Sequence, residues 1–224
     1  MLSGNTMDRK NKNIFLEALL LTLLLFLIGI LIGVLFEQQR VDKIEEYYIQ
    51  SEVSLMDIFA FNNFVDLNMA ECAPLVHYNV NFANRIYEEA KLLEKYEDSG
   101  KISDDLEAQH AKYDVMRTLL WINTMKADNL CGNNIHTVVY LYEYNPDDLT
   151  QRAVNSVWSK ILSEVKAIHG DDLILIPIAV NSDIVALNAI LENYEIASFP
   201  ALVIDNEEVI TELSTVEEVE TYLI

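Results

Sequence analysis

The chain contains few of the residues that define several large classes of protein. Among its 224 residues there are only two cysteines, four prolines and six glycines. Two cysteines exclude a cysteine-rich miniprotein, in which several disulfides replace a hydrophobic core. The low proline and glycine contents exclude fibrous and low-complexity sequences. Because 51% of the residues are hydrophobic, the chain is not a disordered polymer and has the composition of a folded protein.

Basic residues are also scarce. The chain has 15 Lys and Arg against 36 Asp and Glu, which gives a formal net charge of −21. A surface this acidic repels a phosphate backbone, so we expect no nucleic-acid partner. Residues 37–224 hold 12 of the basic and 34 of the acidic side chains, and their net charge favours solubility.

One long hydrophobic run stands near the N-terminus. Residues 18–36 include no charged side chain, and sixteen of these nineteen residues are hydrophobic. As a helix rising ~1.5 Å per residue they span about 28 Å, which is enough to cross a bilayer core. A cleaved signal peptide has an apolar core of ~7–15 residues and a small-residue cleavage site, whereas this run continues directly into Glu37. We therefore predict an uncleaved transmembrane signal anchor at residues 14–36.

The distribution of basic residues around this run predicts its orientation. Arg9, Lys10 and Lys12 precede it, whereas the fifteen residues after it hold Arg40 and Lys43. Basic residues concentrate on the cytoplasmic side of membrane helices. We therefore expect a single-pass protein of the cell membrane, with residues 1–13 in the cytoplasm and the acidic body outside it.

Gly29 and Gly33 form a GxxxG step inside the predicted span. This spacing lets two membrane helices approach closely, which suggests a homodimer. Glycine is also common in membrane helices that have no such role. Both interpretations of this pair stay open.

Residues 37–130 have the apolar spacing of helices. After the span, apolar positions recur at steps of three and four residues, among them Val41, Ile44, Tyr48, Leu55 and Ile58. This spacing predicts that the membrane helix continues as a stalk. Pro74 suits the first turn of a second helix, Ser99-Gly100 ends it, and Ser103 caps a third. We expect a helical hairpin whose apolar stripes pack against one another.

The pattern changes at residue 135, where β-branched and aromatic residues begin to alternate with helical segments. The predicted strands are 135–142, 173–180, 199–204 and 208–212. Helices follow the first and second strands, and a capping box at Ser214–Glu217 opens a last one. The order β-α-β-α-β-β-α predicts an α/β domain over residues 131–224. Its two strand-helix-strand units imply that the strands they join run parallel. A tight turn makes the last strand pair an antiparallel hairpin.

This order, with Ser198-Phe199-Pro200 opening the third strand, resembles the thioredoxin superfamily. The resemblance implies a minimal thioredoxin-like domain in which Pro200 follows a cis peptide bond and faces the active site. It also implies that a Cys-Pro-x-Cys redox motif belongs between the first strand and its helix. Here those four positions read Asn145-Pro146-Asp147-Asp148, so the proline matches and both cysteines are missing. Pro177, inside the second strand, is expected at the edge of the sheet.

The missing sulfurs decide the chemistry that we expect. Thiol-disulfide exchange requires an attacking thiolate and a second sulfur, and neither Asn145 nor Asp148 supplies one. We expect Asn145, or the pair Asp147 and Asp148, to cap or favour the following helix N-terminus. A metal or acid-base role for the acidic pair is the weaker alternative. The four histidines show no ligand spacing, so we predict no metal site, no cofactor and no catalytic residue.

Cys72 and Cys131 stand at the two ends of the predicted helical hairpin. An extracytoplasmic compartment permits a structural disulfide between them. The alternative is a redox couple, which would make the protein a thiol-disulfide oxidoreductase or isomerase. Their wide spacing and the absence of a CxxC motif favour the structural bridge.

The expected function is a binding module. In the redox-active relatives, the residue before the cis-proline pairs through its main chain with a polypeptide, and this mode of binding does not need sulfur. By this resemblance the module docks a polypeptide or a partner subunit on a surface formed by Tyr144, Asn145, Ser198, Phe199 and Pro200. Besides the oxidoreductase, a structural subunit of a membrane complex stays open as an alternative.

Overall fold

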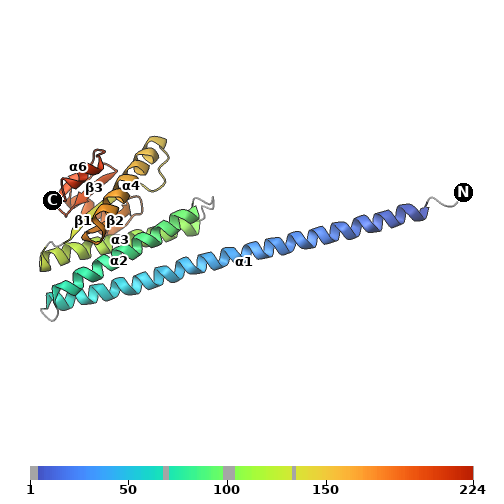
Figure 1. The fold of residues 1–224 in the computed structure, drawn as a ribbon, viewed down its shortest axis with the longest axis horizontal. Helices are drawn as coiled ribbons and strands as arrows, with labels where there is room; N and C mark the ends of the chain where they lie inside the picture. The colour runs from blue at the N-terminus through green and yellow to red at the C-terminus, as the bar shows by residue number, and fades with distance from the viewer. Residues whose placement is uncertain (1–4, 68–70, 98–103, 133–134, 224) are drawn as a thin grey trace. The chain divides into compact units, whose positions relative to one another are not determined.

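The computed structural model describes residues 5–67, 71–97, 104–132 and 135–223 (Figure 1). The chain divides into two units, Met1–Tyr47 and Tyr48–Ile224. The predicted helix stop at Ser99-Gly100 and the predicted cap at Ser103 lie outside the described residues.

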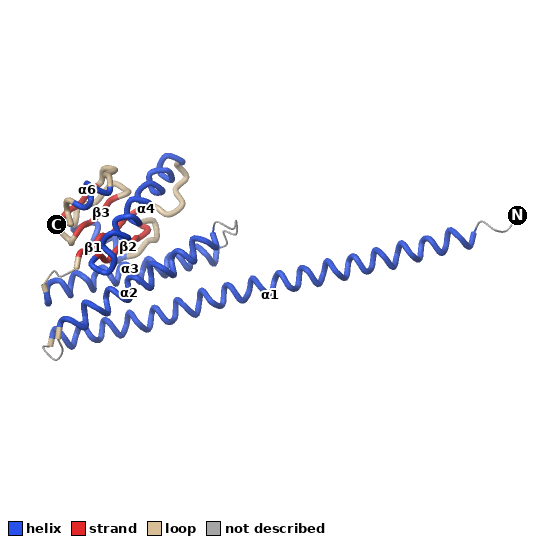
Figure 2. Tube along the Cα trace, in the orientation of Figure 1, coloured by secondary structure: helices blue, strands red, loops and turns tan. Residues whose placement is uncertain are grey.

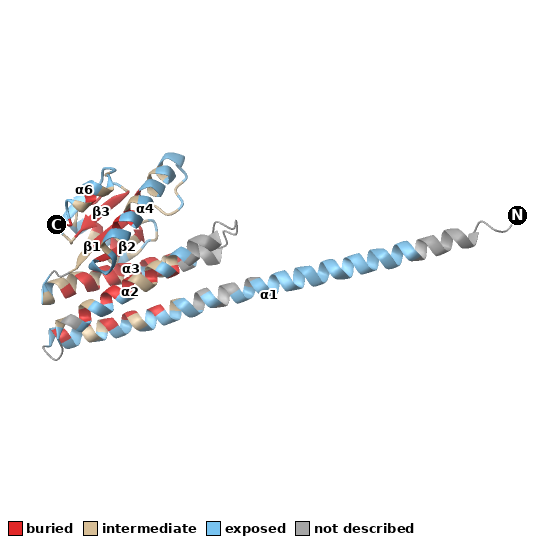
Figure 3. Ribbon diagram, in the orientation of Figure 1, coloured by how far each residue is buried: buried red, intermediate tan, exposed pale blue. Residues whose placement is uncertain are grey.

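The first unit is formed by the N-terminal part of helix α1, which runs without a break over Asn5–Asp66. Its segment Ile14–Phe36 has 23 residues and is long and apolar enough to cross a membrane. The residues of this segment are exposed, and Figure 3 colours them pale blue. This confirms a single apolar N-terminal helix of membrane-spanning length among the described residues, and its orientation stays a prediction.

In the second unit, the C-terminal part of α1 forms a bundle with α2 (Cys72–Glu97) and α3 (Asp104–Cys131) (Figure 2). Leu55 and Ile58 of the predicted stripe are buried in the bundle and Tyr48 is half-buried, whereas the side chains of Val41 and Ile44 lie outside the described residues. The buried side chains of these helices include Leu55, Leu75, Phe82, Ile86, Tyr113, Met116 and Leu120. For the described side chains, the expected packing of the stripes against one another is therefore confirmed.

One buried asparagine from each helix forms a polar layer within this bundle. Asn62 of α1 donates its Nδ2 hydrogen to Asn123 Oδ1 of α3, and Asn123 Nδ2 donates to Asn79 Oδ1 of α2 at 2.7 Å. The three side chains are at most 2% exposed. A buried amide without a partner destabilises the folded chain by ~1–3 kcal/mol, so a shift of any one helix along its neighbours is disfavoured.

A second polar layer centres on Glu89 of α2. Ser51 of α1 donates to Glu89 Oε2 at 2.8 Å, and the hydroxyl of Tyr113 on α3 donates to the same oxygen at 3.3 Å. Burial raises the pKa of Glu89, whereas these two hydrogen bonds lower it. The two layers together specify the register of the three helices.

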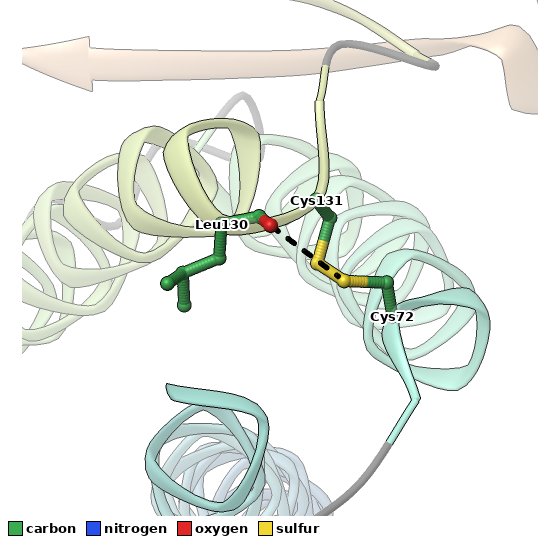
Figure 4. The surroundings of a disulfide bond; sticks show 3 residues. All are labelled: Cys72, Leu130 and Cys131. Atoms are coloured by element: carbon green, nitrogen blue, oxygen red, sulfur yellow. Dashed lines mark hydrogen bonds between the residues drawn. A yellow bond between two sulfur atoms is a disulfide. The ribbon is translucent and has the colours of Figure 1, made fainter. Parts of the chain in front are cut away.

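A disulfide joins the first residue of α2 to the last residue of α3 (Figure 4). The Cα atoms of Cys72 and Cys131 are 5.5 Å apart. The dashed line in Figure 4 is a 3.9 Å contact between Cys72 Sγ and the carbonyl oxygen of Leu130. Because a disulfide sulfur carries no hydrogen, this is an S···O contact rather than a hydrogen bond. The bridge closes one end of the helical hairpin, as the sequence predicts.

The sheet has four described strands in the order β2-β1-β3-β4. The strands are β1 (His136–Tyr142), β2 (Leu173–Ala179), β3 (Ala201–Ile204) and β4 (Glu208–Ile210). The accompanying helices are α4 (Leu149–His169), the 3-10 helix η1 (Gly170–Asp172), α5 (Val185–Asn193) and α6 (Val216–Glu220). Pro177 lies on the edge strand β2, which confirms the prediction for this proline.

The direction of β3 corrects one expectation. β1 and β2 are parallel, but β3 runs antiparallel to β1, so only the first of the two strand-helix-strand units is a parallel one. The hydroxyl of Tyr194, just after α5, donates to Asn206 O in the β3–β4 turn. The chain then returns along residues 195–200 to the end of the sheet where β2 finished. β3 therefore starts at that end and runs back, and β4 pairs antiparallel with it as expected.

Two local boundaries also differ from the sequence prediction. The third strand begins at Ala201 rather than Phe199, because the ladder with β1 starts at the pair Leu141 and Ala201. The capping box of α6 uses Thr215 and Glu218, one residue later than predicted. Thr215 and Glu218 have the same three-residue spacing and the same chemistry as Ser214 and Glu217, so the pattern alone does not distinguish the two registers.

Strands β1, β2 and β3 are buried on both faces, whereas the edge strand β4 is largely exposed. One face contributes Val138, Leu175 and Leu202 to a core that Trp158 and Leu162 of α4 complete. The alternate residues on the other face of β1 and β2 are also buried. β2 packs against α2 and α3, so the helical hairpin covers the edge of the sheet that carries Pro177.

The turn between β3 and β4 is held by side chains from distant elements. Asp205 and Asn206 both have positive φ angles, 49° and 60°. Trp121 Nε1 donates to Asn206 Oδ1 at 2.8 Å, and Asn206 Nδ2 donates to Asp128 Oδ2 at 3.1 Å. His136 Nδ1 lies 2.7 Å from Asp205 Oδ2. These contacts attach α3 to the end of the sheet opposite Pro200.

We predict that replacing both cysteines lowers the stability of the protein. In the chain-entropy model, a disulfide that closes a loop of this length contributes up to ~4 kcal/mol. The double variant C72S/C131S should therefore unfold at a lower denaturant concentration than the wild type, and reductant should shift only the wild type. Two freely alkylated thiols in denatured, unreduced wild-type protein would contradict the bridge.

A second prediction concerns Asp128, whose pKa is raised from 3.8 to about 6 by burial and by the nearby charge of Asp205. Because the pKa is higher in the folded than in the unfolded chain, the associated stabilisation is complete below pH 3.8 and is lost as the pH rises through 6. Asp128→Asn should raise the melting temperature at pH 7.5 by about 2–4 °C, the shift for roughly 1 kcal/mol in a protein of this size. The difference from wild type should disappear near pH 4.

The exposed Asp147 provides the matched control, because Asp147→Asn makes the same charge change away from the turn. An equal stabilisation by both variants would show a general effect of net charge and would contradict a specific role of Asp128.

Candidate functional site

The end of β1, the start of α4 and the segment before β3 meet at one end of the sheet. Leu141 pairs with Ala201, the first residue of β3. In the first turn of α4, Gln151 Nε2 donates to the main-chain oxygen of Phe199 at 2.9 Å. The Phe199–Pro200 peptide bond is cis. Segments that are about fifty residues apart in the sequence therefore form one site.

Exposure differs among the three residues that precede β3. Ser198 is exposed, Phe199 is half-buried and Pro200 is buried. Pro200 therefore does not offer its ring to a partner, and the accessible groups belong to Ser198 and Phe199. Neither of these two residues is in the ladder with β1, which begins at Ala201.

The loop after β1 is fixed by two neighbours. The main-chain N–H of Tyr144 donates to Asn181 Oδ1, and Asn181 Nδ2 donates to Tyr144 O, both at 2.9 Å. The ring of Tyr144 stacks on His110 of α3 with 4.2 Å between centroids. Asn145 follows, exposed and with a φ of 46°.

The four residues Asn145–Asp148, where the sequence resemblance predicts a redox motif, do not all lie at the helix terminus. Asp148 is the N-cap of α4, and its side chain accepts the N–H of Thr150 at 2.8 Å, so the predicted capping by an acidic residue is observed. Capping by Asn145 is wrong, because this residue lies three positions before the cap. Pro146 disfavours the helical conformation of the residue before it, and asparagine tolerates the left-handed one that Asn145 adopts.

Side chains of α4 also hold the loop from behind. Arg152 Nε donates to the carbonyl oxygen of Pro146 at 2.5 Å, and Asn155 Nδ2 donates to Glu143 O at 3.0 Å. The main chain over residues 143–146 is thus bound to α4 at two points, which gives the loop a defined shape.

A cavity of about 650 Å³ adjoins this loop. Side chains of α2, α3, the two parallel strands and α4 line it, together with Tyr144, Asn145 and Pro146. Sequence reasoning missed this cavity, because its walls come from elements that are separate in the sequence and share no motif. The sequence offers no signal that would have assembled them.

A buried ion pair stands at the wall that α3 contributes. Arg117 Nη1 donates to Asp114 Oδ1 at 3.1 Å, and the two side chains are 4% and 0% exposed. Asp114 also accepts the N–H of Ala179 and the hydroxyl of Ser182, each at 3.1 Å. Burial raises the pKa of Asp114, and Arg117 opposes this shift. Burial and the charge of Arg117 lower the pKa of His110 to about 4, so this imidazole is neutral at neutral pH.

The histidines outside the cavity have local partners. His136 contacts Asp205, and His169 Nε2 lies 3.8 Å from Glu220 Oε1. His77 Nε2 lies 2.9 Å from Asn81 Nδ2 within α2. Within the described parts of the chain, no group of three or more His, Cys, Asp or Glu side chains is arranged to hold a metal ion.

Comparison with known proteins adds little to this picture. No family model and no curated protein matches the chain. One solved structure, titled "Structure of a malarial protein", is similar over 40% of this chain and 94% of its own, with 10% identity and a TM-score of 0.32. A similarity this weak carries no argument about fold or function.

Proposed function

We propose that this protein is a membrane-tethered, thioredoxin-like binding module that has lost dithiol chemistry and docks an extended polypeptide beside Pro200. The order of strands and helices from His136 to Glu220 is β-α-β-α-β-β-α, apart from the short η1, and this supports the thioredoxin-like assignment. The apolar segment Ile14–Phe36 supports the tether. By the positive-inside argument, the module lies outside the cytoplasm.

The observation that carries the docking proposal is the main chain just before β3. Ser198 and Phe199 precede Ala201, the first residue of β3 that pairs with β1, and Ser198 is exposed. Main-chain groups outside a ladder are a template on which an extended peptide adds as a strand. Gln151 holds the Phe199 carbonyl, and a carbonyl oxygen has a second lone pair for a peptide N–H.

The placement of sulfur supports the absence of dithiol chemistry. The two cysteines are bridged to each other at the ends of α2 and α3. The N-terminus of α4, where the active relatives place a thiol, has the carboxylate of Asp148 as its cap. A carboxylate can accept the helix N–H groups but cannot attack a disulfide.

We predict that the full-length protein in detergent does not reduce insulin disulfides above the rate without protein. The reason is that Asn145 and Asp148 replace the attacking and resolving sulfurs. The C72S/C131S variant is the control for the remaining sulfurs. Turnover that disappears in this variant would assign the chemistry to Cys72 and Cys131 and would contradict the binding-module proposal.

We also predict that a bulky side chain at position 198 blocks peptide docking. Full-length protein should bind a subset of extended peptides on a cellulose array, and Ser198→Trp should weaken this binding at least about tenfold, equivalent to ~1.4 kcal/mol. Thr211→Trp, which adds the same ring at an exposed position just after β4, should bind as the wild type does. Equal binding by both variants, or no binding by the wild type, would contradict docking at this surface.

A further inference from the structure

The cavity beside α4 is lined by more basic than acidic side chains, unlike the chain as a whole. Among the described residues that line it, four are basic, namely Lys91, Arg117, Arg152 and Lys160, and one is acidic, Glu143. Two of the four cations have a carboxylate partner outside the lining, since Arg117 pairs with Asp114 at 3.1 Å and Lys91 with Glu88 at 2.9 Å. The chain as a whole has 15 basic and 36 acidic residues, so more than a quarter of its cations face one cavity. A cleft lined by one sign of charge raises the local concentration of ligands of the opposite sign.

Arg117 is the most enclosed of these cations. The residue is 3% exposed and reaches the cavity from α3. Its Nη1 donates to Asp114 Oδ1, which also accepts the N–H of Ala179. The hydroxyl of Ser182 donates to the other oxygen, Asp114 Oδ2. The Nε of Arg117 is buried and has no hydrogen-bond partner among the described residues. A guanidinium held on one side with a buried N–H unused is prepared for an anion, which it binds through paired hydrogen bonds.

The other walls indicate the remainder of the ligand. Ser156, Ser159 and Ser163 recur at steps of three and four residues, so their hydroxyls lie along one face of α4. The half-buried rings of Tyr87 and Tyr142 also line the cavity and supply apolar surface with polar tips. This combination suits a compact molecule that has hydroxyl groups. The volume of about 650 Å³ falls in the range of ~300–1,000 Å³ that is typical of small-molecule sites.

We propose that this cavity binds a small, hydroxyl-bearing anion, such as a phosphorylated or carboxylated sugar, with its anionic group at Arg117. Arg152 and Lys160 of α4 and Lys91 of α2 attract the ligand from the more exposed side. The site is separate from peptide docking at Ser198, although the loop at Tyr144 and Asn145 adjoins both. The proposal therefore does not depend on the proposed function.

Titration calorimetry on the full-length protein in a non-ionic detergent tests this site. The probes are glucose 6-phosphate, glucuronate, glucose and inorganic phosphate. We expect glucose 6-phosphate or glucuronate to bind, and the preferred one identifies the anionic group as a phosphate or a carboxylate. Glucose and free phosphate should each bind at least about tenfold more weakly, because each lacks one part of the recognised chemistry. Failure of all four probes to bind below ~10 mM would overturn the proposal.

Variants locate the binding. Arg117→Lys keeps the charge but removes Nε and the planar fork, and it should weaken binding about tenfold or more. The double variant Arg152→Gln/Lys160→Gln alters exposed side chains, so it tests the same cavity even if the Arg117 variant fails to fold. We expect it to lose about threefold to tenfold in affinity for the ligand. Lys126→Gln is the matched control, because Lys126 lies outside the cavity and contacts Asp66. A loss of affinity in this control equal to that of the double variant would overturn the assignment.

Discussion

The arrangement of the second unit depends on the buried carboxylate of Asp114. This group is fully buried on α3 and accepts hydrogen bonds from Arg117 of its own helix, from Ala179 at the end of β2 and from Ser182 beyond it. A buried charge is tolerated only when it is paired and hydrogen-bonded, so the loss of any of these partners would destabilise the folded arrangement. They hold α3 at one position along the edge strand of the sheet.

The position of α3 has consequences at both ends of the sheet. At the end where β1 finishes, His110 of α3 stacks on Tyr144, and Arg117 forms a wall of the cavity. At the opposite end, Trp121 and Asp128 bind the β3–β4 turn through Asn206. The helical hairpin is therefore part of the sheet's environment, and both belong to the single compact unit Tyr48–Ile224. The disulfide and the asparagine layer keep the hairpin in the register that these interactions need.

The two proposed binding surfaces use different physical devices. The segment at Ser198 and Phe199 offers main-chain groups, which suit an extended chain of varied sequence. The cavity offers a buried guanidinium and a row of hydroxyls, which suit one small molecule of defined chemistry. Because the loop at Tyr144 and Asn145 borders the cavity and follows the strand that pairs with β3, a change in its shape would reach both surfaces.

The sequence by itself determined the apolar span, the helical hairpin with its cysteines at the ends, the order of strands and helices, and the edge position of Pro177. Each of these follows from local periodicity, from caps or from the missing N–H of proline, and such signals act within a few residues. The direction of β3, the cap at Asp148 instead of Asn145, and the burial of Pro200 were decided by the tertiary structure, because each depends on which neighbour a segment meets. The cavity depended entirely on the fold, because it brings together Arg117 of α3 and α4 residues that follow Arg117 by 35 positions or more. No local spacing in the sequence predicts that these residues line one cavity.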